Sequence, residues 1–371
     1  MIGIDYTPAY EQRGGIGRYV RELIGALAQI DSHSAYRLLV LGGTGQILPP
    51  LPGPNFSYMG TSLSPLMLAR LWHRAHIPLY VETFTKKIRL FHATDFVLPP
   101  TRRRTRTLLT VHDLSFVRVP ESASPRLKAY LDAVVPRSCR RADHILADSQ
   151  ATKDDLISLY GLPDEKITVL YSGVDARFQP ITDLGLRRAV RNKYKLGSAP
   201  YILAVGTIQP RKNYERLMQA VATLPSAFNG VKLVISGGKG WLDGPIHALA
   251  KQLGSRVQMI GYAEDEDLPA LYAESVCVAF PSLYEGFGLP VLEGMASGVP
   301  VLTSNVSCLP EVAGDAALMV DPYSVEAIRD GLITLLEGDQ RERIARGIAQ
   351  AKRFSWHDAA RKLREIYQQL A

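Results

Sequence analysis

The sequence predicts an α/β protein built from two doubly wound parallel-sheet domains that face a central cleft, and three observations support this fold class. The 371 residues exceed what one hydrophobic core comfortably holds, which favours two domains. Short apolar runs rich in β-branched residues alternate with helical patterns, as in a parallel sheet. The alternation stops in a polar interval over residues 175–200 and then restarts. The domain boundary is therefore predicted near residue 180.

Six strands are predicted in each domain, so that residues 1–180 form the first domain and residues 181–354 the second. The predicted strands cover residues 1–6, 36–43, 88–94, 107–113, 144–149 and 167–174, then 201–207, 231–238, 257–262, 276–281, 299–303 and 317–321. Ligands of such sheets bind beyond the carboxyl ends of the strands, where helix N-termini offer free N–H groups. Functional residues are therefore expected directly after strands.

Composition indicates a globular enzyme without a membrane span. Hydrophobic residues make up 46% and charged residues 21% of the chain, which argues against disorder. The three cysteines are scattered and lack CxxC spacing, so they are interpreted as reduced, buried thiols of a cytoplasmic protein. No signal peptide is recognised, and no run reaches the roughly 18 apolar residues of a transmembrane helix.

Positive charge is concentrated in the first half of the chain. Residues 1–178 contain 22 Lys and Arg against 16 Asp and Glu, or +6 of the total +7. Nine basic residues fall in segment 65–106, interleaved with apolar ones. Two interpretations stay open: peripheral contact with an anionic membrane or a phosphorylated acceptor, and a solvated basic helix face. No nucleic-acid partner is expected, because no reading module accompanies the charge.

Two cations follow the first strand of the second domain. The apolar run 201–206 is followed by Thr207-Ile208-Gln209-Pro210-Arg211-Lys212-Asn213 at the predicted start of a helix. Arg grips phosphate oxygens in bidentate fashion and Lys adds a point charge. Arg211 and Lys212 are therefore candidates for stabilising a leaving diphosphate. The alternative is a solvated loop pair.

Two carboxylates, Glu285 and Glu293, flank a glycine-containing turn in the segment Pro281-Ser282-Leu283-Tyr284-Glu285-Gly286-Phe287-Gly288-Leu289-Pro290-Val291-Leu292-Glu293. The glycines allow backbone to approach a ligand, and a helix predicted to begin near Leu289 presents N–H groups to phosphate. Glu285 lies in the turn before that helix, so the two carboxylates need not share a face. They are interpreted as contacting two parts of one extended ligand, while a helix-capping role is the alternative for Glu285.

These segments resemble glycosyltransferase family 4, whose retaining members have the GT-B architecture of two facing Rossmann-like domains. Residues 281–293 resemble the family's E-x7-E signature, and residues 206–213 its phosphate-binding loop. The helix after Phe354-Ser355-Trp356 resembles the segment that crosses back, so residues 355–371 are expected to join the first domain. The sequence departs from many relatives at Thr207, where they have Arg.

The resemblance implies a nucleotide-sugar donor site in the second domain. Catalytic roles fall to Glu285, at the donor sugar, and to Arg211 and Lys212, at the pyrophosphate, whereas Glu293 binds the ribose. The remaining donor-binding residues implied there are Thr207, Tyr262, Gly286, Phe287, Gly288 and Leu289.

In the first domain the resemblance covers three loops. Gly14 and Gly15 resemble the glycine loop near the donor phosphates and the acceptor. His112 resembles the family's histidine at a strand end, which implies a catalytic role at the sugar or in its environment near the reacting carbon. Asp113 and Ser149 are assigned to the acceptor side.

Two glycine or acidic patterns point to other chemistry and are set aside. Asp265-Glu266-Asp267 has the form of a metal-binding DxD, but it lies in an acidic run before a predicted helix and is interpreted as an N-terminal charge cluster. Gly42-Gly43-Thr44-Gly45 lacks full GxGxxG spacing and an immediate helix, which favours a strand-ending loop. No metal ion and no cofactor beyond the nucleotide-sugar co-substrate are expected.

The resulting hypothesis is a metal-independent, retaining hexosyltransferase. The resemblance is greatest to mannosyltransferases of bacterial polysaccharide assembly, which favours GDP-mannose as the donor and a glycan or lipid-linked acceptor. It implies same-face substitution in which a leaving-phosphate oxygen accepts the acceptor proton. Four alternatives remain: another donor such as a UDP- or dTDP-sugar, a nucleotide-sugar epimerase, a non-catalytic binding protein, and a dehydrogenase, which the missing glycine fingerprint disfavours.

Overall fold

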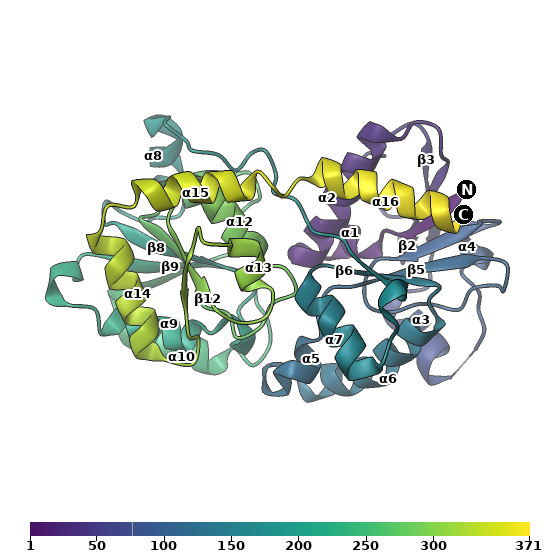
Figure 1. The fold of residues 1–371 in the computed structure, drawn as a ribbon, viewed down its shortest axis with the longest axis horizontal. Coiled ribbons are helices and arrows are strands. Elements are labelled where there is room, and N and C mark those ends of the chain that lie inside the picture. The colour runs from purple at the N-terminus through teal and green to yellow at the C-terminus, as the bar shows by residue number, and fades with distance from the viewer. Residues whose placement is uncertain (76) are drawn as a thin grey trace. The chain divides into compact units, whose positions relative to one another are not determined.

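A computed structural model describes residues 1–75 and 77–371, and these form two compact units (Figure 1). The first unit comprises Met1–Leu114, Ala129–Gly173 and Ser355–Ala371. The second comprises Ser115–Lys128 and Val174–Phe354. The second unit therefore includes a stretch from the middle of the predicted first domain.

The first unit is built on a seven-stranded parallel sheet in the order β3-β2-β1-β4-β5-β6-β7. Its strands are β1 (Ile2–Asp5), β2 (Tyr36–Leu41), β3 (Phe56–Thr61), β4 (Leu90–Ala93), β5 (Arg106–Val111), β6 (His144–Ala147) and β7 (Ile167–Val169). The sequence predicted six of these and missed β3. β3 is an edge strand in which only Phe56 and Thr61 are buried, so it lacks the continuous apolar run of a central strand.

The helices of the first unit are α1 (Thr7–Glu11), α2 (Gly15–Ile30), α3 (Pro65–Ala69), α4 (Glu82–Thr85), α6 (Pro125–Arg141), α7 (Gln150–Tyr160) and α16 (Trp356–Leu370), with a π-helical turn η1 (Arg70–Arg74) after α3. The first residues of α6 belong to the second unit. α2 and α16 pack side by side, although they lie at opposite ends of the chain (Figure 1).

A buried hydrogen-bond chain fixes α16 to the sheet. The hydroxyl of Tyr367 lies 2.7 Å from His92 Nδ1, and His92 Nε2 lies 2.8 Å from the hydroxyl of Thr110. Burial lowers the pKa of His92 to about 3, so the imidazole is neutral and one of its nitrogens accepts. The C-terminal helix is thus joined to the centre of the sheet by a satisfied polar network.

The second unit has a six-stranded parallel sheet in the order β10-β9-β8-β11-β12-β13. Its strands are β8 (Tyr201–Val205), β9 (Lys232–Ser236), β10 (Val257–Gly261), β11 (Cys277–Phe280), β12 (Val301–Ser304) and β13 (Leu318–Val320). All six were predicted. Strand order reverses between β8 and β11, and in doubly wound sheets ligands bind at this switch point.

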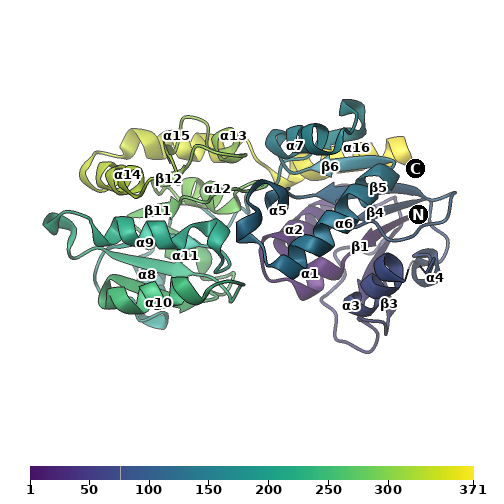
Figure 2. The ribbon, with the colours of Figure 1, turned by 90° about the horizontal axis from the view of Figure 1, so that it is seen from below.

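Helices cover both faces of this sheet (Figure 2). The helices of the second unit are α5 (Ser115–Arg118), α8 (Leu184–Lys193), α9 (Tyr214–Ala222), α10 (Gly244–Leu253), α11 (Leu268–Glu274), α12 (Leu289–Ala296), α13 (Leu309–Ala313), α14 (Val325–Glu337) and α15 (Arg341–Ala351). α9, α10 and α14 share one apolar core with the strands. α8 lies inside the interval 175–200 that the sequence predicted as a polar connection, where Asp183 caps it and Arg187 and Arg191 pair with Glu274.

Within the described residues, no helix combines the length and apolar character needed to cross a bilayer.

Replacing Tyr367 by Phe should destabilise the first unit by about 1–2 kcal/mol, because a buried nitrogen of His92 loses its partner. Urea unfolding followed by tryptophan fluorescence measures this change. Tyr323→Phe, at an exposed tyrosine of the second unit, is the matched control. Equal stability of the two variants would contradict the anchoring role of Tyr367.

Candidate functional site

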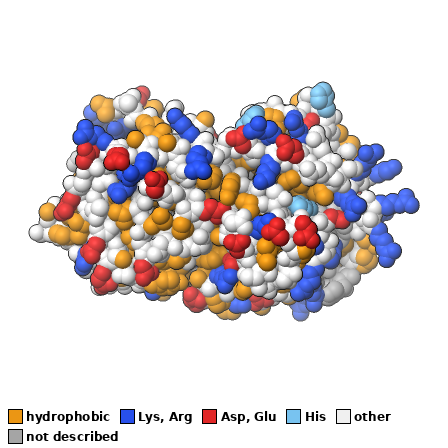
Figure 3. Space-filling view, in the orientation of Figure 1, with side chains coloured by type: hydrophobic (Ala, Val, Ile, Leu, Met, Phe, Trp, Pro, Cys, Tyr) orange, Lys and Arg blue, Asp and Glu red, His pale blue; other side chains and the backbone are white. Residues whose placement is uncertain are grey.

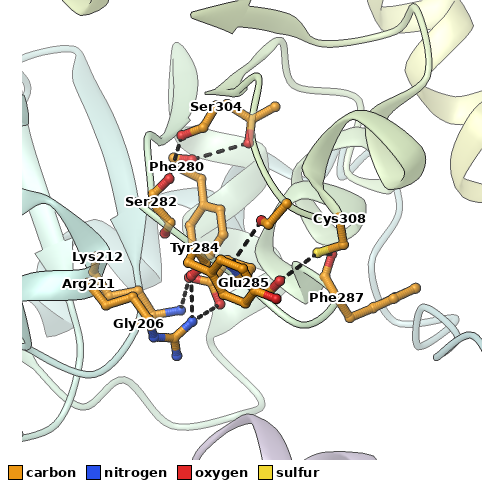
Figure 4. Close-up of polar contacts among 12 residues, drawn as sticks. Gly206, Arg211, Lys212, Phe280, Ser282, Tyr284, Glu285, Phe287, Ser304 and Cys308 are labelled. Atoms are coloured by element: carbon orange, nitrogen blue, oxygen red, sulfur yellow. Dashed lines mark hydrogen bonds and ion pairs between the residues drawn. The ribbon is translucent and has the colours of Figure 1, made fainter. Parts of the chain in front are cut away.

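A buried ion cluster joins the two segments that flank the switch point of the second sheet. Arg211 and Lys212 follow β8, and Glu285 follows β11. The Arg211 guanidinium donates to Glu285 Oε2 at 2.6 Å and to the Tyr284 carbonyl at 2.7 Å, while Lys212 Nζ lies 2.7 Å from Glu285 Oε1 (Figure 4). Each carboxylate oxygen of Glu285 therefore has its own cation.

The cluster is an electropositive site shielded from water. The side chains of Arg211, Lys212 and Glu285 are only 15%, 11% and 7% exposed. Burial raises the pKa of Glu285, but the charges and hydrogen bonds of the two cations outweigh it and leave the pKa below its usual value. Two cations and one carboxylate leave a net charge of +1, which favours an anionic ligand.

Local backbone geometry places both cations. They lie in a 3₁₀ turn, Pro210–Lys212, that ends at Asn213 in a left-handed conformation with φ 60°. The Asn213 amide donates to the carbonyls of Pro281 and Pro322 at 2.9 and 2.7 Å, and the Leu283 N–H donates to the Arg211 carbonyl at 2.9 Å. The turn after β8 is thereby fixed to the segment after β11.

Two glycines permit the close approaches that the site requires. Gly288 precedes α12 with φ 101°, a conformation that L side chains rarely adopt. Gly237, after β9, was not predicted as part of the site. A Cβ there would lie 1.9 Å from the Gly206 carbonyl oxygen. Only glycine lets these two strand ends meet.

Glu293 lies within α12 and Glu285 in the turn before it, so the predicted separation of the two carboxylates onto different elements is confirmed. Glu293 is 3% exposed, and its carboxylate accepts a hydrogen bond from the Tyr272 hydroxyl at 2.7 Å. Tyr262 is partly buried after β10, and its hydroxyl donates to Asp265 at 2.8 Å. Thr207 is partly buried after β8.

His112 lies in the first unit, at the carboxyl end of β5. Its Nδ1 lies 2.8 Å from Asp148 Oδ2 and its Nε2 2.9 Å from the carbonyl oxygen of Thr94. The Thr94 carbonyl only accepts, and so does Asp148 when it is ionised; both ring nitrogens then donate and the ring carries the imidazolium charge. Burial opposes this charge, but Asp148 and Asp95 outweigh burial and raise the pKa of His112 to about 9.

The ring of His112 has no nitrogen to spare for a sugar hydroxyl in this arrangement. Burial also raises the pKa of Asp148, and this effect outweighs the charge of His112, which lowers it. The Oδ1 atom of Asp148 is buried without a hydrogen-bond partner among the described residues. The structure thus shows His112 as a buried ring whose two nitrogens are bound by Asp148 and Thr94, and its predicted role near the donor sugar stays a prediction.

The other predicted residues of the first unit occupy helix starts and strand ends. Gly14 and Gly15 are exposed at the N-terminus of the 16-residue helix α2, where N–H groups point outward. Asp113 is partly buried after β5. Ser149 is fully buried and caps α7, because its hydroxyl accepts from the Thr152 N–H at 3.1 Å. That contact gives Ser149 a structural role.

The acidic run before α11 is a helix-start cluster, as predicted. Asp267 immediately precedes α11, and its carboxylate accepts from Lys193 at 2.5 Å and from the Tyr194 hydroxyl at 2.6 Å. Across residues 1–75 and 77–371 no three His, Cys, Asp or Glu side chains are arranged to hold a metal ion.

Sequence reasoning missed a set of small polar side chains on β12 and the turn after it. They hydrogen bond to the segment that carries Glu285: Thr303, Ser304, Ser307 and Cys308. Ser, Thr and Cys occur widely in cores and turns, so no spacing in the sequence distinguishes these residues.

The comparisons with known proteins identify the family. The family models described as Glycosyl transferases group 1 and Glycosyltransferase Family 4 match residues 187–353 and 13–178. The O-antigen chain mannosyltransferase B of Escherichia coli is 34% identical over 375 residues, covering 96% of each chain. This chain belongs to glycosyltransferase family 4 and is a glycosyltransferase, as its motifs predicted.

Further relatives and solved structures support the family membership and the fold. The serotype-specific mannosyltransferase WbdA of Escherichia coli is 36% identical over 228 residues, which are 59% of this chain and 28% of that protein. Sucrose-phosphate synthase from Thermosynechococcus elongatus superposes with a TM-score of 0.78 at 21% identity, covering 100% of this chain and 98% of that one. WaaG, a glycosyltransferase involved in lipopolysaccharide biosynthesis, has a TM-score of 0.73 at 17% identity, covering 99% of each chain. The predicted GT-B fold of two Rossmann-like domains is confirmed.

Replacing His112 by Gln should destabilise the first unit by about 3 kcal/mol or more at pH 6, because Asp148 is left buried without its cation. The pKa of His112 is raised from its ordinary 6.5 to about 9, so its contribution is complete below pH 6.5 and is lost as pH rises through 9. The difference in unfolding free energy between wild type and variant should therefore shrink from pH 6 to pH 10. A difference independent of pH would show that the imidazole is neutral.

Proposed function

We propose that the protein transfers mannose from GDP-mannose to a hydroxyl of a lipid-linked or oligosaccharide acceptor during assembly of a surface polysaccharide. Transfer retains the anomeric configuration and needs no metal ion. The names of the whole-length relative, O-antigen chain mannosyltransferase B, and of WbdA support the sugar and the process. The site itself supports a diphosphate-bearing donor.

The observation that carries the proposal is the buried cluster of Arg211, Lys212 and Glu285 at the switch point of the second sheet. A diphosphate brings the negative charge that the cluster lacks, and little water is present to screen the attraction. The N-terminus of α12 adds N–H groups and a positive dipole beside it. These groups stabilise the departing nucleoside diphosphate, which is the charge that develops during transfer.

Each residue then has one task. Arg211 and Lys212 hold the diphosphate, which requires them to share or give up Glu285. Glu285, released to the sugar, accepts hydrogen bonds from its hydroxyls, and Glu293 accepts from the ribose. The acceptor hydroxyl attacks from the face that the phosphate leaves, forming the new C–O bond while a leaving-phosphate oxygen takes its proton. Glu285 is not a nucleophile in this scheme.

Two alternative functions would give other products than the proposed mannosyl transfer. A transferase of another donor would select a UDP- or dTDP-sugar; the solved structure of HepE from Anabaena, for example, holds UDP and glucose. An epimerase would release free sugar of changed configuration and form no glycosidic bond. Analysis of nucleotide preference and product separates both from the proposed mannosyl transfer.

Glu293→Gln should weaken binding of GDP-mannose about tenfold or more, because the amide replaces a charged acceptor of the ribose while its volume stays the same. Calorimetry with GDP-, UDP-, ADP- and dTDP-sugars measures this on the wild type and the variant. Glu342→Ala, at an exposed glutamate of α15, is the control. Failure of the wild type to bind any of these sugars would refute the donor site.

Turnover should persist unchanged after exhaustive chelation, since two protein cations neutralise the leaving group. Nuclear magnetic resonance of the initial product should show an α-linked mannose, the configuration of the donor. Restoration of a lost activity by Mg²⁺ or Mn²⁺, or a β-linked first product, would contradict the proposed mechanism.

A lipid-linked acceptor lies in a membrane, so the enzyme needs access to a bilayer surface. We propose that segment 65–106 docks on an anionic bilayer. Leu66 and Met67 on α3 and Ile77 and Tyr80 after η1 are 57%, 48%, 46% and 38% exposed. Exposed cations follow at the end of this segment: Lys86, Lys87, Arg89 and Arg102 to Arg104. Figure 3 shows Lys and Arg side chains gathered at the edge of the first unit over α4. His76, within the segment, lies outside the described residues.

Glu82 connects the apolar and basic parts of this surface. Its Oε1 accepts from the Arg102 N–H at 2.9 Å and from the Thr105 hydroxyl at 2.5 Å, which ties the arginine loop to α4. Apolar side chains beside cations match a bilayer surface, into which the former insert while the latter contact anionic headgroups.

Reversing charge at Arg102, Arg103 and Arg104 to Glu should weaken binding to phosphatidylglycerol vesicles more than about 100-fold, because each cation contributes about 1 kcal/mol near such a surface. Flotation of full-length protein with vesicles measures the effect. Leu66→Ser with Met67→Ser should also weaken binding, whereas Leu184→Ser with Leu186→Ser, exposed on α8, should not. The proposed membrane contact would be refuted if the wild type floated equally with phosphatidylglycerol and neutral phosphatidylcholine vesicles, or if it floated with neither type of vesicle.

A further inference from the structure

The segment that carries Glu285 is held from two sides. On one side Arg211 and Lys212 bind the carboxylate of Glu285. On the other side the end of β12 and the turn after it bind its backbone (Figure 4). The cations are expected to engage the donor diphosphate, whereas the second set of contacts binds the backbone of Glu285 and can stay in place once the donor is bound.

This second set is a ladder of side-chain hydrogen bonds that follows the backbone from Phe280 to Phe287. The hydroxyl of Thr303 donates to the Phe280 carbonyl at 3.1 Å, and that of Ser304 to the Ser282 carbonyl at 2.6 Å. All four of these residues belong to β11, β12 or the residues directly after them. The ladder therefore begins as an extension of the pairing between the two strands.

Its last two steps reach Glu285 itself. The Ser307 hydroxyl oxygen accepts from the Glu285 N–H at 3.0 Å. The Cys308 thiol lies 3.2 Å from the Glu285 carbonyl oxygen and 3.1 Å from that of Phe287. Both backbone polar groups of Glu285 are thus bound by neighbouring side chains of one turn.

The turn adopts a costly conformation to make these contacts. Ser307 has φ 53°, in the left-handed region that a non-glycine residue occupies at a cost of about 1 kcal/mol or more. Glycine would adopt it without strain but has no hydroxyl to accept from Glu285. Such strain persists where the surroundings enforce it and is concentrated at functional sites.

Cys308 is placed so that its sulfur contacts the Glu285 loop at two carbonyl oxygens. It is fully buried at the start of α13, and its thiol faces two carbonyl oxygens rather than apolar carbon alone. Cys277, the other cysteine of the second unit, is also fully buried but lies on β11 within the shared apolar core. The two thiols are therefore a matched pair that differs in contact with the Glu285 loop.

We propose that Ser307 and Cys308 are positioning residues that fix Glu285 for the sugar of the donor, independently of its nucleotide. This inference rests on the proposed donor site. According to this proposal, Glu285 binds the transferred sugar, and the uncharged turn with Ser307 and Cys308 sets the position of Glu285. A purely structural role for the turn is the competing explanation, and it predicts losses of stability and of all ligand binding together.

The test compares binding of GDP-mannose with binding of GDP, or of the corresponding pair that the nucleotide panel selects, by calorimetry on the full chain. Ser307→Gly relieves the strain but removes the hydroxyl that accepts from the Glu285 N–H, so the two effects on stability oppose each other and its Tm should stay close to that of the wild type. We expect its affinity for the nucleotide sugar to fall about five- to tenfold while its affinity for the nucleotide changes less than about twofold.

The cysteine variants supply an independent arm. Cys308→Ala should show the same selective loss, Cys308→Ser should recover part of it because a hydroxyl can donate to the same carbonyls, and Cys277→Ala should lose stability without any selective loss. Equal changes in affinity for both ligands, or unchanged affinity for the nucleotide sugar in Ser307→Gly, would overturn the positioning role while the donor site stands. A wild type that binds neither ligand would overturn the donor site and this inference with it.

Discussion

The ion pairs of Glu285 with Arg211 and Lys212 are the interaction around which the second unit's site is organised. They join the segments after β8 and β11, which are neighbours in the sheet but about seventy positions apart in the chain. A buried carboxylate is stable only with such partners, and buried cations likewise. The cluster therefore constrains both loops at once.

The six strands of the second sheet follow the same order as the first six of the first sheet, but the side chains at the strand ends differ in charge. In the first unit, acidic side chains occupy the carboxyl ends of the strands: Asp5, Asp95, Asp113 and Asp148. Burial is the largest cause that raises the pKa of Asp5 to about 6, and it also raises the pKa of Asp95. His112 supplies the compensating positive charge. The corresponding edge of the second unit instead carries the cations Arg211 and Lys212 beside Glu285.

Most of the fold could be predicted from the sequence because parallel strands are buried on both faces and read as apolar runs. All six strands of the second unit were found this way. β3 was missed because an edge strand needs fewer buried residues than a central one. α8 was missed because ion pairs with Glu274, rather than an apolar stripe, attach this helix to its neighbour. The assignment of Ser115–Lys128 to the second unit depends on contacts such as Trp241 with the Ser122 carbonyl, which no local pattern encodes.

For the site, the sequence by itself determined the types of chemistry: the cations Arg211 and Lys212, the carboxylates Glu285 and Glu293, and the glycines between them. These residues have distinctive charge and spacing, and they follow strands whose positions the sequence also determines. Only the tertiary structure decided that both nitrogens of His112 are engaged, that Ser149 is a helix cap, and that Ser307 and Cys308 hold Glu285. The physical reason is that a hydrogen bond depends on distance and direction between atoms, and residues remote in the chain acquire these only when the sheet brings their strand ends together.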